Sequence, residues 1–356
     1  MNAGGAETFL MKVYRKLDKS RFQIDFCINT SDKCFYEDEI LSMGGRIYRI
    51  PAKSQNPKAF SKQLGELVRN HKYQYVLRIT SNAMGFMDLK IAKQAGAKIC
   101  AARSSNSSDG AGWKSWVAHR LGRALFSKYV DMRFAPSDLA ARYTFGNSAY
   151  EDGKVSILKN AVDLSIFHFD ELGRVAIREE LGVSPDALLI GHVGRFDTQK
   201  NHEFLLEVFR EIAHRQPDAI LLLVGKGGLE QPVREKAAAL EIADKVIFAG
   251  VRSDVPQLLS AMDVFVFPSL YEGMPNTVIE AQSTGLPCVI ADTITREADI
   301  TGLVQYLPLA ASPDIWAETV LASVCKQRKD TTQAFIEHHY DIQSTVREFV
   351  RLCFQE

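Results

Sequence analysis

The strongest constraint on the fold is the alternation of short β-branched or aromatic runs with longer helical patterns along almost the whole chain. Alternation of this kind is typical of parallel sheets whose strands are joined by crossover helices. Nearly all residues of the runs are apolar, as expected of strands that helices cover on both faces. The pattern therefore predicts an α/β fold of doubly wound parallel sheets.

The runs form two series, and 356 residues are more than one hydrophobic core usually serves. The first series predicts strands at residues 22–29, 45–50, 73–79, 97–101 and 132–137. The second predicts strands at residues 187–195, 219–225, 245–250, 264–269 and 287–292. We expect an N-terminal domain at residues 1–160, a second domain at 161–335, and a C-terminal helix at 336–356 that crosses back to the first.

The first series begins in an unusual way. A helical pattern follows Gly4 and Gly5, although a doubly wound domain normally begins with a strand. We therefore expect that the first strand of the N-terminal domain is missing. The two glycines let a backbone approach a ligand closely, but a glycine pair before a helix is more often simple turn chemistry.

The composition indicates which partners and which cellular compartment suit the protein. The 43 basic and 43 acidic side chains cancel, which argues against nucleic acid as a partner. Six cysteines without a C-x-x-C pair fit a reducing compartment, and neither a leader nor a membrane-spanning run is evident. We expect a cytoplasmic protein.

The segment after the strand at 187–195 brings two cations to a strand end. Arg195 and Lys200 lie just past its carboxyl end, where open α/β sheets bind ligands. A guanidinium and an ammonium group together suit a diphosphate, although two solvated side chains in a loop are an equally simple interpretation. His192 and His202 flank this segment, and we expect core or capping roles for them rather than a metal site.

A second segment combines two carboxylates with a helix start. Glu272 and Gly273 follow the strand at 264–269, a helix is expected from Pro275, and Glu280 lies within it. A carboxylate can hold two neighbouring sugar hydroxyls, and backbone N–H groups at a helix start attract phosphate. The N–H groups expected to face a ligand are those of Met274, Asn276 and Thr277. The alternative is that both glutamates only complement the helix dipole.

Together these residues resemble glycosyltransferase family 4, whose members have the GT-B fold of two Rossmann-like domains facing a cleft. GRFDTQKNH resembles the family's phosphate-binding segment, and Glu272 to Glu280 its E-x7-E motif. The resemblance implies that Arg195 and Lys200 contact the donor diphosphate, Glu272 the transferred sugar and Glu280 the ribose. MNAGGAET resembles the N-terminal glycine loop, which implies a role for Gly4 and Gly5. VGKGG and FAGVRSDV resemble the segments around the nucleobase, which implies contacts from Gly227 and Val251.

The resemblance also implies a reaction. It points to bacterial enzymes of exopolysaccharide, capsule or lipopolysaccharide assembly that transfer a sugar from a nucleotide-diphosphate donor, here a UDP-sugar, with retention of configuration. Such enzymes need no metal ion or other cofactor, and this chain has no Asp-x-Asp pair. Many relatives carry histidines where this chain has Arg103 and Ser105, so the acceptor side is assigned to these two residues.

One helical segment of the first domain mixes apolar and basic side chains. Between residues 113 and 130, Trp113, Trp116, Val117, Leu121, Leu125 and Phe126 alternate with Lys114, His119, Arg120, Arg123 and Lys128. One hypothesis is peripheral contact with the inner membrane leaflet, where a glycan or polyprenyl-linked acceptor would be met. The alternative is an ordinary helix whose apolar side lies in the core.

Two other functions fit the same sequence. A nucleotide-sugar epimerase of the same fold would alter the donor without an acceptor. A non-catalytic subunit would bind the nucleotide sugar and support a partner transferase. A nicotinamide dehydrogenase is disfavoured because no G-x-G-x-x-G follows a strand.

Overall fold

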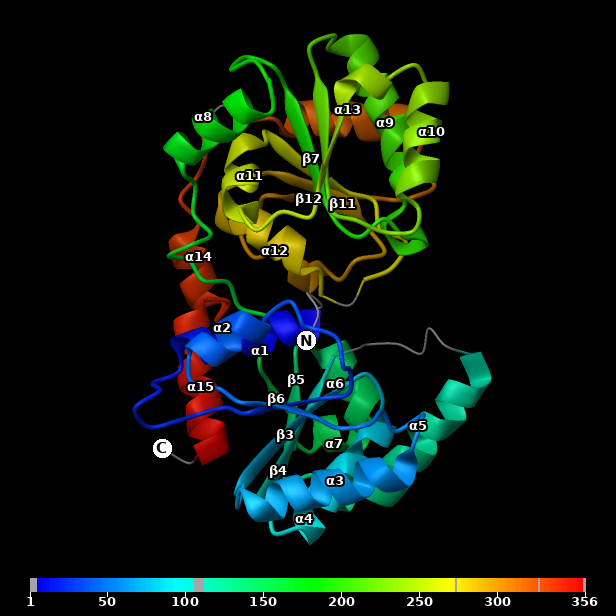
Figure 1. The fold of residues 1–356 in the computed structure, drawn as a ribbon. Helices are drawn as coiled ribbons and strands as arrows, with labels where there is room; N and C mark the ends of the chain where they lie inside the picture. Colours follow the sequence, from blue (N-terminus) through cyan, green and yellow to red (C-terminus); the bar gives the residue numbers. More distant parts are fainter. Residues whose placement is uncertain (1–4, 106–111, 273, 326, 355–356) are drawn as a thin grey trace. The chain divides into compact units, whose positions relative to one another are not determined.

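The computed structural model describes residues 5–105, 112–272, 274–325 and 327–354 (Figure 1). The chain divides into two compact units. Unit 1 comprises Met1–Ala161 and Ile342–Glu356, and unit 2 comprises Val162–Asp341. Both are built from parallel strands joined by helices, as the sequence predicts.

Unit 2 holds a six-stranded parallel sheet with the strand order β12-β11-β10-β7-β8-β9. Its strands are β7 (Leu189–Val193), β8 (Ile220–Val224), β9 (Val246–Gly250), β10 (Val264–Phe267), β11 (Cys288–Ala291) and β12 (Val304–Leu307). This is the Rossmann order, in which the direction of winding reverses between the first strand and the fourth. The reversal places β7 beside β10, with Ile190 opposite Val264.

Helices cover both faces of this sheet. One apolar cluster packs on α9 (His202–Arg215), α10 (Glu230–Ala239) and α13 (Pro313–Ser323), and includes Leu206, Phe209 and Trp316. The other packs on α8 (Glu171–Glu180), α11 (Val255–Ala261) and α12 (Asn276–Ser283), and includes Leu258 and Val278. Figure 1 shows α9 and α10 on one side of the sheet and α11 and α12 on the other. Burial on both faces explains why β7, β8, β10 and β11 are almost wholly apolar.

The strands of unit 1 form two separate parallel sheets. β1 (Phe26–Ile28) pairs with β2 (Ile47–Arg49), while a four-stranded sheet has the order β3-β4-β5-β6. The latter strands are β3 (Tyr75–Thr80), β4 (Ile99–Ser104), β5 (Met132–Ala135) and β6 (Ser156–Ile157). Within the described residues, neither β1 nor β2 pairs with a strand of the longer sheet. The gap falls where a Rossmann domain would place its first strand.

Helices again cover both faces of the longer sheet of unit 1. The helices of this unit are α1 (Gly5–Lys16), α2 (Glu37–Ser42), α3 (Pro57–Asn70), α4 (Phe86–Gln94), α5 (Gly112–Phe126), α6 (Asp138–Phe145), α7 (Asn147–Glu151) and the C-terminal α15 (Ile342–Phe354). Apolar residues of α3, α4 and α6 pack on one side of β4 and β5, and those of α1 and α15 on the other. No helix in the described part of the chain is long and apolar enough to cross a membrane.

The C-terminal crossing begins later than predicted. The expected boundary after residue 335 falls inside α14 (Thr332–Glu337). Phe335 and Tyr340 are buried in unit 2 against Val162 and Ile279, and Asp341 bridges to Val162. The chain therefore returns to unit 1 only with α15, which packs beside α1. Short 3₁₀ turns complete the fold: η1 (Ala83–Gly85), η2 (Ser127–Tyr129), η3 (Thr198–Lys200), η4 (Ala243–Lys245) and η5 (Arg296–Ala298).

The loop after β8 approaches the loop after β7 so closely that glycine is required. Gly225 has a φ of +143°, and a Cβ atom there would overlap the carbonyl oxygen of Gly194. A Cβ atom at Gly227 would likewise overlap the carbonyl oxygen of Phe196. A Cβ atom at Gly228, by contrast, would point into open space. The two glycines thus allow the loops after β7 and β8 to lie against each other.

We predict that Gly225→Ala lowers the free energy of unfolding by about 2 to 4 kcal/mol, because the backbone angle and the overlap both oppose a side chain. Gly228→Ala is the matched control and should change it by less than about 0.5 kcal/mol. Urea denaturation of the two variants and the wild type measures the difference. Equal stability of the two variants would contradict this account.

Candidate active site

The carboxyl ends of β7, β8, β9 and β10 lie at one edge of the unit 2 sheet, because these strands are parallel. Ligands of open α/β sheets bind at such an edge, close to the point where the strand order reverses. Here the reversal lies between β7 and β10. The predicted residues of unit 2 follow these strand ends, or lie in the helix that comes after β10.

An ion pair joins the loops that follow β7 and β10. The Nζ atom of Lys200 lies 2.5 Å from Oε1 of Glu272. The two side chains are only 16% and 10% exposed, so water screens their attraction less than it would at the surface. The structure therefore brings into contact two residues that lie far apart in the sequence and that we assigned to different parts of a sugar nucleotide.

The Lys200 side chain is held over the end of β7. A Cβ atom at Gly194 would lie 3.2 Å from Lys200 Cδ, which shows how closely the aliphatic chain passes. Its ammonium group lies 4.5 Å from the centre of the Phe267 ring at the end of β10, within the range of a cation–π contact. Gly194 and Phe267 thus direct the charge of Lys200 to the point where the strand order reverses.

Asp197 organises the loop that carries both predicted cations. Its carboxylate caps η3 by accepting from the backbone N–H of Lys200, and its Oδ2 accepts from Arg195 Nε at 2.7 Å. The Arg195 side chain is 73% exposed, so the remaining N–H donors of its guanidinium group are open to solvent. Arg195 and Lys200 are therefore linked through Asp197, with Arg195 at the surface and Lys200 beneath it.

Further hydrogen bonds fix this loop to the segment after β10. Gln199 donates from its side chain to the carbonyl oxygen of Tyr271 at 2.8 Å, and its own carbonyl accepts from the Leu270 N–H. Asn201, in the left-handed region with φ 54°, donates to the carbonyl oxygen of Pro268. The relative position of Lys200 and Glu272 thus rests on several contacts besides their own ion pair.

The helix after Glu272 begins one residue later than predicted. Pro275 is the N-cap of α12, whose first residue is Asn276, because the Pro275 carbonyl accepts from Val278 and Ile279. Glu280 lies on α12 and is 8% exposed. Asn276 and Thr277 occupy its first turn, while Met274 lies just before the helix. The first backbone N–H groups of an α-helix have no acceptor within the helix, which suits them to an anion.

Two polar side-chain atoms around this segment are buried without a hydrogen-bond partner in the described part of the chain. They are Oγ of Ser269 and Oδ1 of Asn276. A buried polar atom without a partner costs about 1 to 3 kcal/mol. A ligand hydroxyl or water that reached these atoms would remove that cost.

The residues predicted near a nucleobase follow the next two strands. Gly227 lies in the loop after β8, against Phe196, and Val251 lies directly after β9 with 65% of its surface exposed. The Gly225 N–H donates to the Gly250 carbonyl at 2.8 Å, which ties the two strand ends together. Gly227 and Val251 are therefore at the same edge of the sheet as Lys200.

His192 and His202 form an aromatic layer beneath the ion pair. Both are buried, His202 stacks on Phe196 with ring centroids 4.3 Å apart, and His192 Nδ1 lies 2.9 Å from the Val266 carbonyl. Burial lowers the pKa of His192 well below its ordinary value and that of His202 to about 4. Both imidazoles are therefore neutral near pH 7, which fits the expected core roles.

The predicted residues of the first domain lie in unit 1 or outside the described residues. Gly4 lies outside them, as does Gly273 of the second domain, and Gly5 is the first residue of α1. Arg103 is 1% exposed and donates to the Leu158 carbonyl and to Asn160 Oδ1, and burial lowers its pKa to about 9. Ser105 is exposed at the end of β4. In this structure Arg103 therefore holds the backbone of unit 1, and its acceptor role stays a prediction.

Sequence reasoning missed Asp197 and Phe267. An aspartate placed immediately before a short Thr-Gln-Lys turn is a recognisable cap signal, which could have identified Asp197. The contact of Phe267 with Lys200 depends on β10 lying beside β7 and has no local signal. Pairing between distant strands is needed to find it.

Comparison with known proteins identifies the family. Residues 187–324 match the family model described as glycosyl transferases group 1. The Bacillus subtilis protein EpsF, named as a glycosyltransferase, is 36% identical over 97% of this chain and 92% of its own length. The chain belongs to the group 1 glycosyltransferases.

Two further comparisons concern this glycosyltransferase. An Escherichia coli enzyme, UDP-Gal:alpha-D-GlcNAc-diphosphoundecaprenol alpha-1,3-galactosyltransferase, is 35% identical over 39% of this chain and 37% of its own length. The crystal structure of Anabaena HepE in complex with UDP aligns with a TM-score of 0.77 at 15% identity, covering 99% of this chain and 97% of that one. The structural likeness shows the fold, which is the GT-B fold of two Rossmann-like domains.

The neutral histidines make the stability of the glycosyltransferase depend on pH. As pH falls below about 6.5 the unfolded chain binds a proton at His202, whereas the folded protein does so only near its pKa of about 4. We predict that the free energy of unfolding falls by up to about 3 kcal/mol between pH 6.5 and 4 through this group. The lowered pKa of His192 also makes the free energy of unfolding fall as the pH falls.

Chemical denaturation at several pH values, with wild type and His202→Leu, measures this effect. The variant should show a shallower fall over the same range. His214→Leu is the control, because His214 lies on the same helix and is exposed. A slope unchanged in His202→Leu would show that His202 is not the group responsible.

Proposed function

We propose that this glycosyltransferase moves a sugar from a UDP-sugar to a glycan or lipid-linked acceptor in the synthesis of a cell-surface polysaccharide. We further propose that transfer retains the anomeric configuration and needs no metal ion. The observation that carries the proposal is the Lys200–Glu272 ion pair at the strand reversal of a Rossmann-like unit. The E. coli relative, whose name specifies UDP-Gal and a diphosphoundecaprenol acceptor, supports the choice of donor and acceptor class.

In the proposed donor complex, Lys200 has two tasks. An ammonium group carries three N–H donors, so one can stay with Glu272 while another contacts the diphosphate. Arg195 would add a second cation from the same loop, and the start of α12 would add its backbone N–H groups. Gly227 and Val251 would lie near the nucleobase, and Glu280 would accept from the ribose hydroxyls.

The chemistry follows from these positions. An acceptor hydroxyl oxygen attacks the anomeric carbon while the bond from that carbon to the diphosphate oxygen breaks, and the leaving diphosphate takes the electron pair. The hydroxyl proton passes to a phosphate oxygen on the same face, so no protein base is required. Lys200 and the amino end of α12 would stabilise the charge that builds on the diphosphate, which is the task a metal ion would otherwise have. The second oxygen of Glu272 would accept from a hydroxyl of the transferred sugar.

We also propose peripheral contact of unit 1 with the cytoplasmic face of the membrane, where a polyprenyl-linked acceptor is met. The core interpretation of α5 holds for Phe126, which packs against the core of unit 1, whereas Trp113, Trp116, Leu121 and Leu125 are 48% to 72% exposed. The opposite face of α5 packs on the domain, where His119 accepts from the Ala83 N–H and is buried. We call Trp113, Trp116, Val117, Leu121 and Leu125 the α5 stripe. It is the apolar side of a helix that a bilayer surface would accept.

The rival functions are separated by a transfer assay. Wild type is incubated with UDP-sugars, with and without a lipid-linked acceptor, in the presence of EDTA, and the anomer of the product is read by NMR. We expect transfer that needs the acceptor, survives EDTA and retains configuration. Conversion of the donor without acceptor would favour the epimerase, and loss of transfer with EDTA would contradict metal independence.

In the same assay we predict that Lys200→Met lowers kcat/KM by about a hundred- to a thousand-fold, since the positive charge that would stabilise the leaving diphosphate is lost. Glu272→Gln keeps the shape but leaves Lys200 without its counter-charge, and should cost at least about ten-fold. Lys245→Met is the control, because Lys245 lies at the other end of β9. Full pathway activity with Glu272→Ala would favour the non-catalytic subunit.

A further inference from the structure

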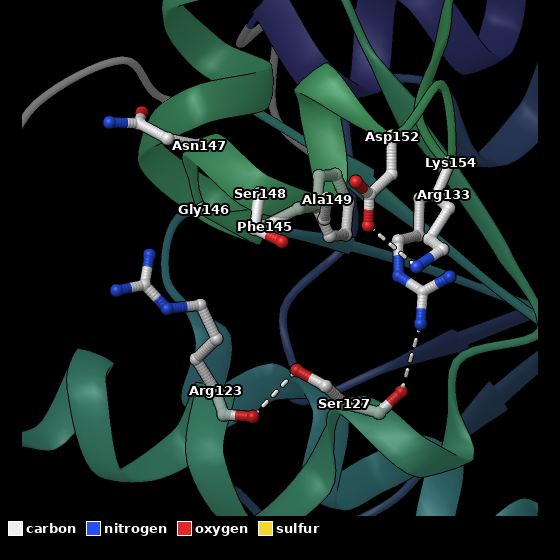
Figure 2. Close-up of a pocket in the computed structure, with 10 residues that line it drawn as sticks. All are labelled: Arg123, Ser127, Arg133, Phe145, Gly146, Asn147, Ser148, Ala149, Asp152 and Lys154. Atoms are coloured by element: carbon white, nitrogen blue, oxygen red, sulfur yellow. Dashed lines mark hydrogen bonds and ion pairs between the residues drawn. The ribbon is translucent and has the colours of Figure 1, made fainter.

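A basic hollow lies in unit 1 at the end of α5 (Figure 2). Its volume is about 470 Å³. Three cationic side chains line it, namely Arg123, Arg133 and Lys154, against one carboxylate, Asp152. Figure 2 shows Arg123 on one side of the hollow and Arg133 with Lys154 on the other. The cations come from α5, from β5 and from the segment after α7, so the fold gathers them from separate parts of the chain.

The contacts of these cations leave them able to bind an anion. Arg133 donates to the Ser127 carbonyl at 3.2 Å, and Arg123 is placed 3.4 Å from the Tyr143 carbonyl. Each guanidinium group has five N–H donors, so one such contact leaves capacity for an anion. Lys154 pairs with Asp152, but both side chains are about half exposed and such a pair is worth at most about 1 kcal/mol.

The surrounding charges do not cancel this cluster. The negative charge of Asp131 attracts Arg133, but Asp131 is itself paired with Lys93 at 2.6 Å. Glu151 is paired with Arg142 at 2.8 Å. Burial lowers the pKa of Arg133, which means that its charged form lacks part of its solvation. An anion in the hollow would restore a favourable environment for that charge.

Backbone geometry keeps the hollow open beside Arg123. Gly146 joins α6 to α7 with a φ of +94°, a conformation that strains other residues. A Cβ atom there would lie 3.3 Å from Arg123 Nη1. The junction therefore turns the chain and leaves room for the guanidinium group at one wall.

The hollow adjoins the α5 stripe along the flank that carries Trp116. Trp116, Arg120 and Arg123 follow one another at positions i, i+4 and i+7 of α5, so they share a face of the helix, and Trp116 is 48% exposed. Arg120, on the same helix, stacks over the Trp116 ring at 4.8 Å. Exposed apolar side chains next to gathered cations match a bilayer surface, which offers an apolar layer beneath anionic phosphate groups. The net charge of the whole chain is zero, so this match is local.

We propose that the basic hollow binds the phosphate group of an anionic phospholipid while the α5 stripe enters the bilayer surface beside it. This inference rests on the proposed membrane contact. It adds a preference for anionic lipid and names the residues responsible, Arg123, Arg133 and Lys154. The headgroup would fix the orientation of unit 1 on the membrane, whereas the stripe supplies apolar area alone.

The test measures binding of the full chain to vesicles of phosphatidylcholine, with and without phosphatidylglycerol. The hollow variant is Arg123→Gln with Lys154→Gln, and Arg142→Gln is the matched control outside the hollow. The stripe variant is Leu121→Ser with Leu125→Ser. We expect the affinity of the hollow variant for vesicles with phosphatidylglycerol to fall about ten- to thirty-fold. Its affinity for vesicles of phosphatidylcholine alone should be unchanged. The stripe variant should lose affinity for both, and Arg142→Gln should match wild type.

If the hollow variant binds phosphatidylglycerol vesicles as tightly as wild type does, the inference is overturned. If the stripe variant still loses vesicle binding in that case, the proposed membrane contact is retained. Absence of vesicle binding by wild type would overturn both. Glycerol 1-phosphate is added without vesicles as a further arm. If glycerol 1-phosphate raises the melting temperature of wild type but not of the hollow variant, and the two bind vesicles equally, the hollow binds a free phosphate compound. That result would overturn the proposal of a lipid headgroup. None of these measurements uses a sugar donor, so they are independent of transfer.

Discussion

The ion pair between Lys200 and Glu272 joins two loops whose residues lie 72 positions apart in the chain. It forms because the Rossmann strand order sets β7 beside β10, so that the loops after these strands meet. Gly194 lets the lysine chain pass over the end of β7, and Phe267 receives its ammonium group. Asp197 and Asn201 hold the loop itself. The positions of Arg195, Lys200 and Glu272 depend on this junction.

A partly buried ion pair also gives the site a way to respond to a ligand. The attraction between the two charges is offset by the cost of removing them from water, so the net stabilisation of the free protein is modest. A diphosphate that approached Lys200 would add a second counter-charge without displacing Glu272, since the ammonium group has three donors. Glu272 can then hold a sugar hydroxyl with its other oxygen, which couples the positions of phosphate and sugar.

The sequence predicted what depends on local pattern. Apolar runs located most strands, and the segments around Arg195, Lys200 and Glu272 indicated the ligand edge. β12 was missed because only the first of its four residues is buried and they do not form an apolar run, and β6 because it has only two residues. The late return of the chain at Ile342 depends on Phe335 and Tyr340 packing in unit 2, which no local pattern reveals. The same limit applies to the hollow in unit 1, whose cations come from three separate elements.

In the proposed donor complex, Lys200 at the strand reversal holds the diphosphate. A crystal structure of the protein with UDP tests it most directly. We expect a phosphate oxygen within hydrogen-bond distance of Lys200 Nζ, close to the amino end of α12, with the ribose against Glu280. Diphosphate bound elsewhere, with Lys200 still paired only to Glu272, would contradict it.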